Sequence, residues 1–224
     1  MLNAIRWASK SLKERGIAQT GSIVLSVTLD VLFDWRHGTD TLRQVDTESL
    51  DINSPNRAHA TQYQPTKARA LKTLLTMLAL PSGAVFVDIG CGKGRVLLLA
   101  AQQNFRKVVG IEFAGDLCAV ARRNAEKFGQ RVNLSAEIEV IEADAATYRF
   151  RADETVLFMY NPFGPAVLEG VLANLRDSLA ADPRRIWLIY NTPNHHDMVM
   201  RSGLFATEKL FVVGGYNFRV YTTN

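Results

Sequence analysis

The stretch from Val85 to Arg95 combines an acidic side chain with three alternating glycines, residue types that suit a ligand-binding loop. Residues 85–89 lack helical spacing and are mostly β-branched or aromatic, which predicts a strand buried on both faces. The glycines that follow are Gly90, Gly92 and Gly94. They allow a sharp turn in which a ligand lies against bare backbone amides. Because Asp88 precedes the turn, the loop can receive a cationic amine as well as adenosine, and residues 95–101 then open a helix.

The glycine spacing separates this loop from two common nucleotide-binding loops. A dinucleotide-binding turn needs Gly-x-Gly-x-x-Gly and the phosphate loop of nucleotide hydrolases needs Gly-x-x-x-x-Gly-Lys-Ser/Thr, and this stretch has neither. Its Asp-x-Gly-x-Gly-x-Gly pattern resembles the first motif of the class I S-adenosylmethionine-dependent methyltransferases. A tight turn of another α/β protein is the alternative. The resemblance implies S-adenosylmethionine as cofactor, bound by Asp88, Gly90, Cys91, Gly92 and Gly94.

The composition indicates one domain with an N-terminal extension, since 224 residues, 47% of them apolar, can bury one substantial core. The net charge of +4 and pI of about 9.2 are compatible with an anionic partner, but an ordinary soluble surface is the favoured interpretation. Cys91 and Cys118 do not make a disulfide framework, so the expected location is cytoplasmic.

The N-terminal region contains two apolar patterns. Residues 1–16 place basic and apolar side chains at the i, i+3, i+7 spacing of a basic amphipathic helix. We favour a helix docked on the core, and contact with membrane headgroups or nucleic acid is the alternative. Residues 23–33 are too short to span a bilayer and contain Asp30, so neither a transmembrane helix nor a signal peptide is expected.

Residues 38–66 are polar and almost without periodicity, and a loop of this length is usually disordered or functional. We expect a substrate lid here. By resemblance to methyltransferases of this class, including some that act on lysine side chains, Tyr63 and Thr66 are candidates to cover the cofactor, and Tyr63 is also a catalytic candidate. Pro65 and Thr66 equally suit a helix N-terminus, which is the structural alternative.

Two further acids end predicted strands downstream. Residues 107–112 end in Glu112, which in a doubly wound sheet stands beside the glycine loop and can accept hydrogen bonds from both ribose hydroxyls. Residues 138–144 form an alternating strand that ends in Asp144. In the family that the loop resembles, an acid here accepts the adenine amino group. The cofactor-binding residues implied at these strand ends are Glu112, Phe113, Asp144 and Ala145.

The predicted strand 155–161 delivers Asn161, Pro162 and Phe163 to the same edge of the sheet. Methyltransferases that modify the adenine amino group or a glutamine amide carry an acid or amide here, then two prolines and an aromatic residue, and the second proline is absent from this chain. The resemblance makes Asn161 and Phe163 catalytic candidates. The Asn161 oxygen and a backbone carbonyl would accept two N–H bonds while Phe163 packs against the methylated group. A type I turn that ends the strand is the alternative.

The C-terminal part of the chain predicts the rest of the sheet. Residues 185–191 repeat the pattern of the preceding strand and also end in Tyr-Asn. His195 and His196 follow without other ligands at suitable spacing, so we expect a surface loop and no metal site. Residues 206–213 and 216–223 predict two strands joined by a glycine hairpin. An antiparallel final strand is a trait of the class I fold.

These patterns predict an α/β fold with a doubly wound, mostly parallel seven-stranded sheet, an antiparallel C-terminal strand and a helical N-terminal extension. We expect an extension and lid over residues 1–60 and a methyltransferase domain over residues 61–224. The expected activity is N-methylation of a protein side chain or small-molecule amine, because the compact chain lacks a target-recognition domain and its positive charge is modest. Adenine in DNA or RNA is the alternative methyl acceptor. A third hypothesis is a catalytically silent module that binds the cofactor. The sequence identifies no general base and does not predict the oligomeric state.

Overall fold

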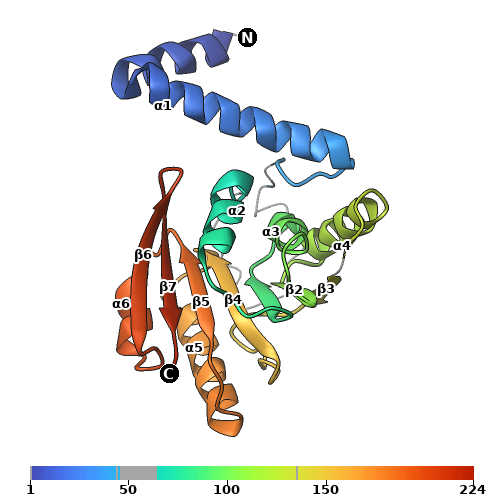
Figure 1. Cartoon of the computed structure of the whole chain (residues 1–224), viewed down its shortest axis with the longest axis vertical. Coiled ribbons are helices and arrows are strands. Elements are labelled where there is room, and N and C mark those ends of the chain that lie inside the picture. The colour runs from blue at the N-terminus through green and yellow to red at the C-terminus, as the bar shows by residue number, and fades with distance from the viewer. Residues whose placement is uncertain (1, 44, 46–64, 135) are drawn as a thin grey trace.

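Helices and strands alternate along most of the chain (Figure 1). The computed structural model describes residues 2–43, 45, 65–134 and 136–224. The helices are α1 (Leu2–His37), α2 (Ala68–Met77), α3 (Arg95–Ala100), α4 (Gly115–Gly129), α5 (Pro165–Ala181) and α6 (His196–Arg201). The strands are β1 (Val85–Ile89), β2 (Lys107–Glu112), β3 (Glu137–Glu142), β4 (Glu154–Tyr160), β5 (Trp187–Asn191), β6 (Thr207–Val213) and β7 (Tyr216–Thr222).

The strands form one seven-stranded sheet in the order β3-β2-β1-β4-β5-β7-β6. The strands from β3 to β5 pair in parallel, whereas β7 is antiparallel to both β5 and β6. The chain order reverses at β1, since β2 and β3 lie on one side of it and β4 and β5 on the other. Open α/β sheets bind ligands at the carboxyl ends of the strands at such a reversal. The predicted sheet with its antiparallel C-terminal strand is confirmed.

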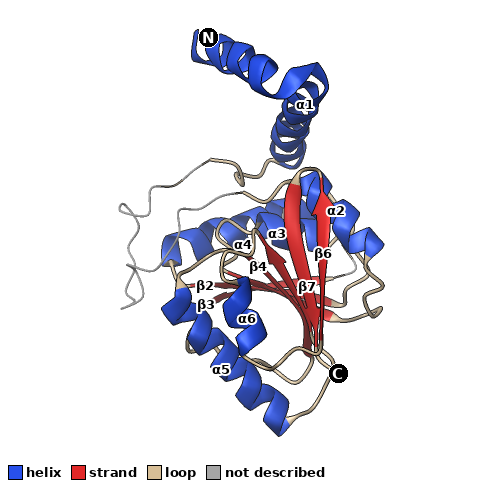
Figure 2. Ribbon diagram, turned by 90° about the vertical axis from the view of Figure 1, so that its left-hand side faces the viewer, coloured by secondary structure: helices blue, strands red, loops and turns tan. Residues whose placement is uncertain are grey.

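Helices cover both faces of the sheet. In Figure 2, α2, α3 and α4 lie on one side and α5 and α6 on the other. The side chains of β1 alternate between these layers, since Val87 and Ile89 belong to the core cluster that includes α5, and Phe86 to the cluster that includes α2 and α3. All five residues of β1 are buried, as the sequence predicts for a strand covered on both faces.

Helix α1, in the N-terminal extension, consists of two helical arms joined by a kink at Gly16. At Gly16 the backbone has φ 76° and ψ 170°, a conformation that glycine adopts without a side-chain penalty. The basic pattern of residues 1–16 and the apolar run of residues 23–33 therefore belong to the two arms of α1. Among the described residues, no helix is both long enough and apolar enough to cross a membrane.

Most of the segment predicted as a lid, including Tyr63, lies outside the described residues. Its two described ends are fixed to the domain. Thr41, after α1, is buried, and so is Thr66, before α2. The Thr66 carbonyl accepts a hydrogen bond from Arg95 Nε at 3.0 Å.

One short helix departs from the sequence prediction. The residues after His195 form α6 rather than a surface loop. His196 Nδ1 lies 2.8 Å from the Tyr221 hydroxyl, and the two rings stack with centroids 5.8 Å apart. Val199 of the same helix is fully buried. Packing against β7 stabilises this helix, which at six residues is too short to show a helical period in the sequence.

Candidate functional site

The glycine loop lies between β1 and α3, at the carboxyl edge of the sheet. Gly90, Gly92 and Gly94 have φ values of 79°, 53° and 80°, which favour glycine. A β-carbon on Gly90 would lie only 2.5 Å from Cβ of Pro162. The missing side chain of Gly90 therefore lets the turn after β4 pack directly against the loop.

The loop amides are bonded within the protein, whereas the sequence analysis expects them to face a ligand. The N–H groups of Gly90 and Cys91 donate to the Ile111 carbonyl at 2.8 and 3.0 Å. The Gly92 N–H donates to Glu112 Oε2 at 2.9 Å. The loop is thus held in shape by β2, and these three N–H groups already have acceptors within the protein.

Glu112 ends β2 and is 5% exposed. Its Oε1 accepts the Ala114 N–H at 3.0 Å, and the N–H groups of Gly92 and Phe113 are further donors to the carboxylate. Burial raises the pKa of Glu112, and these three donors partly offset that effect. A carboxylate offers about four acceptor positions. The two predicted bonds to ribose hydroxyls therefore require Glu112 to release one of its backbone donors.

Asp88 is buried in β1 close to Glu112, with 3% of its surface exposed. Burial raises the pKa of Asp88 well above its usual range, and the charge of Glu112 raises it further. No hydrogen-bond donor from the described part of the chain reaches its carboxylate. A cationic ligand would supply that partner and relieve both effects. The site therefore fits the ammonium group of S-adenosylmethionine.

The Cys91 side chain packs against β2. It is 4% exposed, and a β-carbon on Gly110 would lie 2.7 Å from its Sγ. Burial raises the pKa of the thiol well above its usual range, and the charges of Asp88 and Glu112 add to the effect. The thiol therefore stays protonated, and Cys91 presents only its backbone at the loop.

Asp144 and Ala145 follow β3. Asp144 Oδ1 accepts the Ala146 N–H at 2.8 Å, and its carbonyl accepts the Thr147 N–H at 3.0 Å, so a local turn fixes this acid at the sheet edge. Ala145 lies in the core cluster that includes α5. Recognition of adenine by Asp144 stays a prediction.

Phe113 and the N-terminal extension meet beside Glu112. Phe113 packs on a small cluster made by Ala114 and Leu117, and Val45 packs on the same cluster. The segment after α1 therefore reaches the position where the sequence places the adenosine half of the cofactor. Contact between Phe113 and the cofactor stays a prediction.

Asn161 lies at the end of β4 in an unusual backbone conformation. Its φ of 41° falls in the left-handed region, which asparagine enters more readily than most residues. Its Oδ1 accepts a hydrogen bond from the Tyr190 hydroxyl at 3.0 Å. Tyr190 belongs to β5, and burial raises its pKa to about 12, so the phenol remains a donor at neutral pH. The neighbouring strand thus orients the Asn161 amide.

Phe163 lies in the core. It is 7% exposed and belongs to the buried cluster that includes Val167 and Leu168 of α5. The sequence analysis expects its ring to pack against the methylated group. The core thus anchors the turn through Phe163, and contact between its ring and the methylated group stays a prediction.

Sequence reasoning missed a second strained residue, Thr192, after β5. Its φ is 52°, an outlier for a β-branched residue that persists only when its surroundings hold it. The Thr192 N–H donates to the Asn217 carbonyl at 2.9 Å, and its side chain is hydrogen-bonded to Tyr160. The repeated Tyr-Asn strand ends place the two turns side by side, but the strain depends on this tertiary bonding.

Arg95 was also missed, and it joins three segments directly behind the glycine loop. It is 1% exposed. Its Nη2 lies 2.5 Å from Asp30 Oδ1 of α1, its Nη1 donates to Thr41 Oγ1 at 2.6 Å, and its Nε bonds the Thr66 carbonyl. In the sequence, this junction shows only as a charged residue immediately after Gly94 and an acid, Asp30, within the apolar run 23–33.

Lys93 makes a second junction inside the loop itself. Its Nζ is buried and donates to Asp40 Oδ2 at 2.9 Å. Asn124 of α4 accepts the Asp40 N–H at 2.9 Å and donates to the carbonyls of Asp40 and Lys93 at 3.1 and 2.9 Å. The segment after α1 is therefore bonded to the glycine loop.

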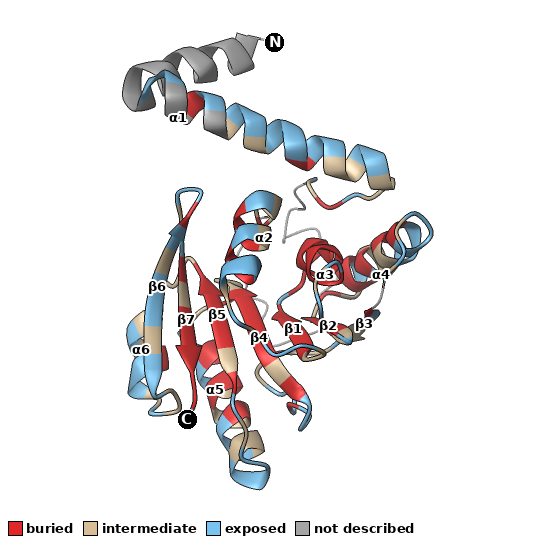
Figure 3. Cartoon of the chain, in the orientation of Figure 1, coloured by how far each residue is buried: buried red, intermediate tan, exposed pale blue. Residues whose placement is uncertain are grey.

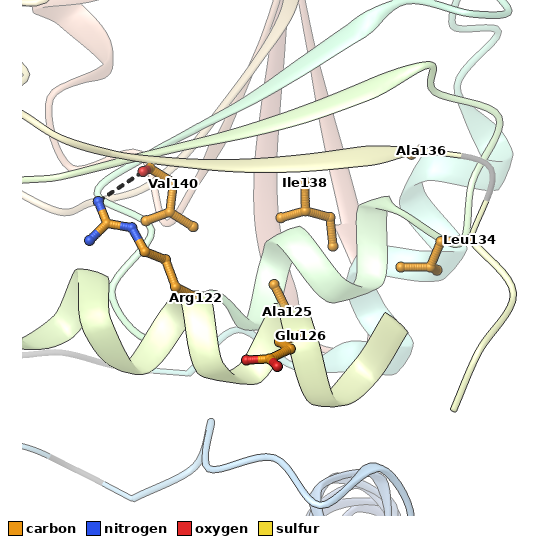
Figure 4. Close-up of a pocket in the computed structure, with 7 residues that line it drawn as sticks. All are labelled: Arg122, Ala125, Glu126, Leu134, Ala136, Ile138 and Val140. Atoms are coloured by element: carbon orange, nitrogen blue, oxygen red, sulfur yellow. Dashed lines mark hydrogen bonds between the residues drawn. The ribbon is translucent and has the colours of Figure 1, made fainter. Parts of the chain in front are cut away.

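A surface pocket of about 310 Å³ lies between α4 and β3 (Figure 4). Its lining residues are Arg122, Ala125, Glu126, Leu134, Ala136, Ile138 and Val140. Arg122 Nη2 donates to the Val140 carbonyl at 3.0 Å. None of the strand-end acids lines this pocket, so we do not assign it to the cofactor.

Comparison with known proteins agrees with this geometry. Residues 86–182 match the family model described as a methyltransferase domain. A ribosomal protein L11 methyltransferase from Thiobacillus denitrificans is 26% identical over 185 residues, which are 79% of this chain and 60% of that protein. A protein-lysine N-methyltransferase from Saccharolobus islandicus is 29% identical over 92 residues, 38% of this chain and 57% of that protein. The chain thus spans about 60% of the length of these relatives.

One solved structure with a similar fold is an RNA methyltransferase from Salinibacter ruber in complex with S-adenosyl-L-homocysteine. The two structures superpose with a TM-score of 0.51 at 22% identity. The matched region covers 71% of this chain and 94% of the Salinibacter ruber chain. At this identity the likeness is evidence of the fold alone. Together with the sheet order and the match over residues 86–182, it shows that the protein has the Rossmann-like fold of the class I S-adenosylmethionine-dependent methyltransferases.

Proposed function

We propose that the protein is a methyltransferase that transfers a methyl group from S-adenosylmethionine to the nitrogen of a protein side chain or a small-molecule amine. The observation that carries this proposal is the contact between Gly90 and Pro162, because it brings the Asn161 turn against the cofactor loop. When bound, the cofactor supplies an electrophilic methyl carbon. The Asn161 amide oxygen beside the methyl group suits a nitrogen as the methyl acceptor. The oxygen would orient the N–H of that nitrogen and stabilise the positive charge that develops on it.

The cofactor would be held by the acids at successive strand ends. Asp88 would receive its ammonium, Glu112 its ribose and Asp144 its adenine amino group. The raised pKa of Asp88 and the lack of a donor to it from the described residues support the first of these roles. The closed glycine loop supports a site that is largely formed before the cofactor binds.

The acceptor would lie beside Asn161. An amide oxygen has two lone pairs, so the bond from Tyr190 is compatible with a second bond from a substrate N–H. This tyrosine then acts by holding the amide in place. Relatives named for ribosomal protein L11 and for protein lysine favour a protein substrate among the amines.

The amine must lose its proton before it attacks, because only the neutral form has a lone pair. Tyr190 is a poor base for this step, since burial raises its pKa to about 12. Burial also raises the pKa of Tyr160. We propose that the proton leaves to solvent or to Tyr63, which resemblance makes a candidate, while a backbone carbonyl accepts a hydrogen bond from the neutral amine.

A radiolabel experiment tests the proposal. The full chain is incubated with S-adenosylmethionine labelled in the methyl group and with protein, nucleic-acid and small-molecule fractions of a cell extract, while calorimetry measures cofactor binding. Label in the protein or small-molecule fraction, on nitrogen, supports the proposal. Label in DNA or RNA identifies the adenine alternative. Cofactor binding without transfer to any fraction would overturn the assignment and favour a silent binding module.

A further inference from the structure

The outward face of α1 is apolar and exposed. Eight of the twelve large apolar side chains that are exposed in the described residues lie between Ile17 and Trp35. Ile17 is 84% exposed and Trp35 81%, and Val24, Leu25, Val31 and Leu32 are each about half exposed. In Figure 3 the exposed residues of this arm of α1 are coloured pale blue. A row of this kind on one helix marks an interaction site rather than scattered surface residues.

The exposed face carries no charge. Asp30 and Asp34 are the only ionisable residues from Gly16 to Trp35. Both point toward the domain, since Asp30 pairs with Arg95 and Asp34 accepts hydrogen bonds from Thr41. One side of the helix is therefore fixed to the protein, and the other offers only apolar and small uncharged groups.

Basic residues flank the apolar face in the sequence. Arg6, Lys10, Lys13 and Arg15 precede it with a single acid, Glu14, and Arg36 follows it. An uncharged apolar helix face that is preceded and followed by cations in the sequence suits a surface that is apolar inside and negatively charged at its border. The exposed Trp35, at the end of the face, has the amphipathic ring that favours a membrane interface.

We propose that α1 docks this face on a bilayer that contains anionic phospholipid, with the helix lying in the plane of the interface. Anionic lipid complements the flanking cations, whereas a second copy of the chain would repeat them. The opposite side of α1 keeps its bonds to Arg95, so the glycine loop lies across the helix from the lipid.

Flotation with vesicles tests the proposal on the full chain. Vesicles of phosphatidylcholine alone are compared with vesicles that also contain phosphatidylglycerol, at low and high salt. The chain should float with the anionic vesicles and be released by salt. The double variant Leu25→Glu/Leu32→Glu should lower the partition coefficient by about tenfold or more. Val212→Glu is the matched control, because Val212 is 66% exposed on β6, outside this face.

Two further measurements make the result decisive. Both positions in the double variant lie at the surface, so an unchanged melting temperature shows that the variant is folded. Sedimentation velocity without lipid measures the oligomeric state. No binding to anionic vesicles, or an equal loss in the Val212→Glu control, would overturn the proposal. A dimer that the double variant converts to a monomer would assign the face to a second copy instead.

Discussion

The Tyr190 hydroxyl donates a hydrogen bond to the Asn161 side-chain oxygen across 3.0 Å and thereby joins the ends of β5 and β4. Tyr190→Phe should leave cofactor affinity near wild type and lower single-turnover methyl transfer by about tenfold, because the amide loses a bond of about 1 kcal/mol that fixes its orientation. Tyr148→Phe is the matched control, since the Tyr148 hydroxyl donates to Glu154 at the start of β4, the opposite end of the strand from Asn161. Equal rates in the two variants would remove Tyr190 from the acceptor site.

The backbone of Asn161 allows a test that separates its side chain from its turn. Glycine and aspartate both tolerate its φ of 41°, but only aspartate keeps an acceptor oxygen. Asn161→Gly should lower turnover by about a hundredfold or more at saturating cofactor, whereas Asn161→Asp should retain more of it. Calorimetry should give similar cofactor affinities for both. Wild-type turnover in Asn161→Gly would show that the residue only forms the turn.

Asp88 should give the protein a pH-dependent stability. Because its pKa in the folded protein is raised, the folded state holds a proton that the unfolded chain has lost. The free energy of unfolding should therefore fall as pH rises from the ordinary carboxyl pKa, about 4, toward the raised value. In Asp88→Asn the free energy of unfolding, measured by denaturation, should depend less on pH than in wild type. Asp153→Asn is a surface control and should show the wild-type pH dependence.

The same carboxyl should also affect cofactor binding. A cationic ligand favours the ionised form of Asp88, so the affinity for S-adenosylmethionine should rise with pH across the same window. Asp88→Asn should bind more weakly and lose that rise. Calorimetry at several pH values measures this affinity. If Asp88→Asn keeps the wild-type dependence of affinity on pH, the ammonium of the cofactor binds elsewhere.

Glu112 has two roles that different substitutions separate. Glu112→Ala should lower cofactor affinity by about 1.5 to 3 kcal/mol for each lost bond, and it should also destabilise the loop by leaving the Gly92 and Ala114 N–H groups without their acceptor. Glu112→Gln keeps one acceptor oxygen. Compared with Glu112→Ala, it should recover part of the free energy of unfolding but less of the cofactor affinity. Melting curves and calorimetry on the same samples measure both, and full affinity in a folded Glu112→Ala would exclude the ribose contact.

The buried pair of Arg95 and Asp30 should hold the extension on the domain. Arg95→Ala should cost about 3 to 5 kcal/mol of unfolding free energy, because it leaves Asp30 buried without its main partner. The double variant Arg95→Met/Asp30→Leu should recover much of that loss. Arg106→Ala, which breaks an exposed pair with Asp153, should cost less than about 1 kcal/mol. Additive losses at Arg95 and Asp30 in urea denaturation would contradict the coupling.

The sequence determined the frame of the site. The glycine spacing after Asp88 and the acids Glu112 and Asp144 at the ends of predicted strands indicated one edge of a doubly wound sheet, and the sheet has the predicted seven strands, mostly parallel with an antiparallel C-terminal strand. These features follow from local patterns, since strand periodicity and turn residues depend on neighbours in the chain. The domain match and the similar folds agree with the cofactor family that the glycine loop resembles.

Only the tertiary structure decided how the site is held together. The bond between Tyr190 and Asn161, the contact of Gly90 with Pro162 and the burial of Phe163 join residues from different strands and helices. The junction of Arg95 with Asp30 connects positions 65 residues apart. No local pattern encodes such pairs, because which side chains meet depends on how the whole chain packs, and packing at close density fixes the partner of every buried polar group.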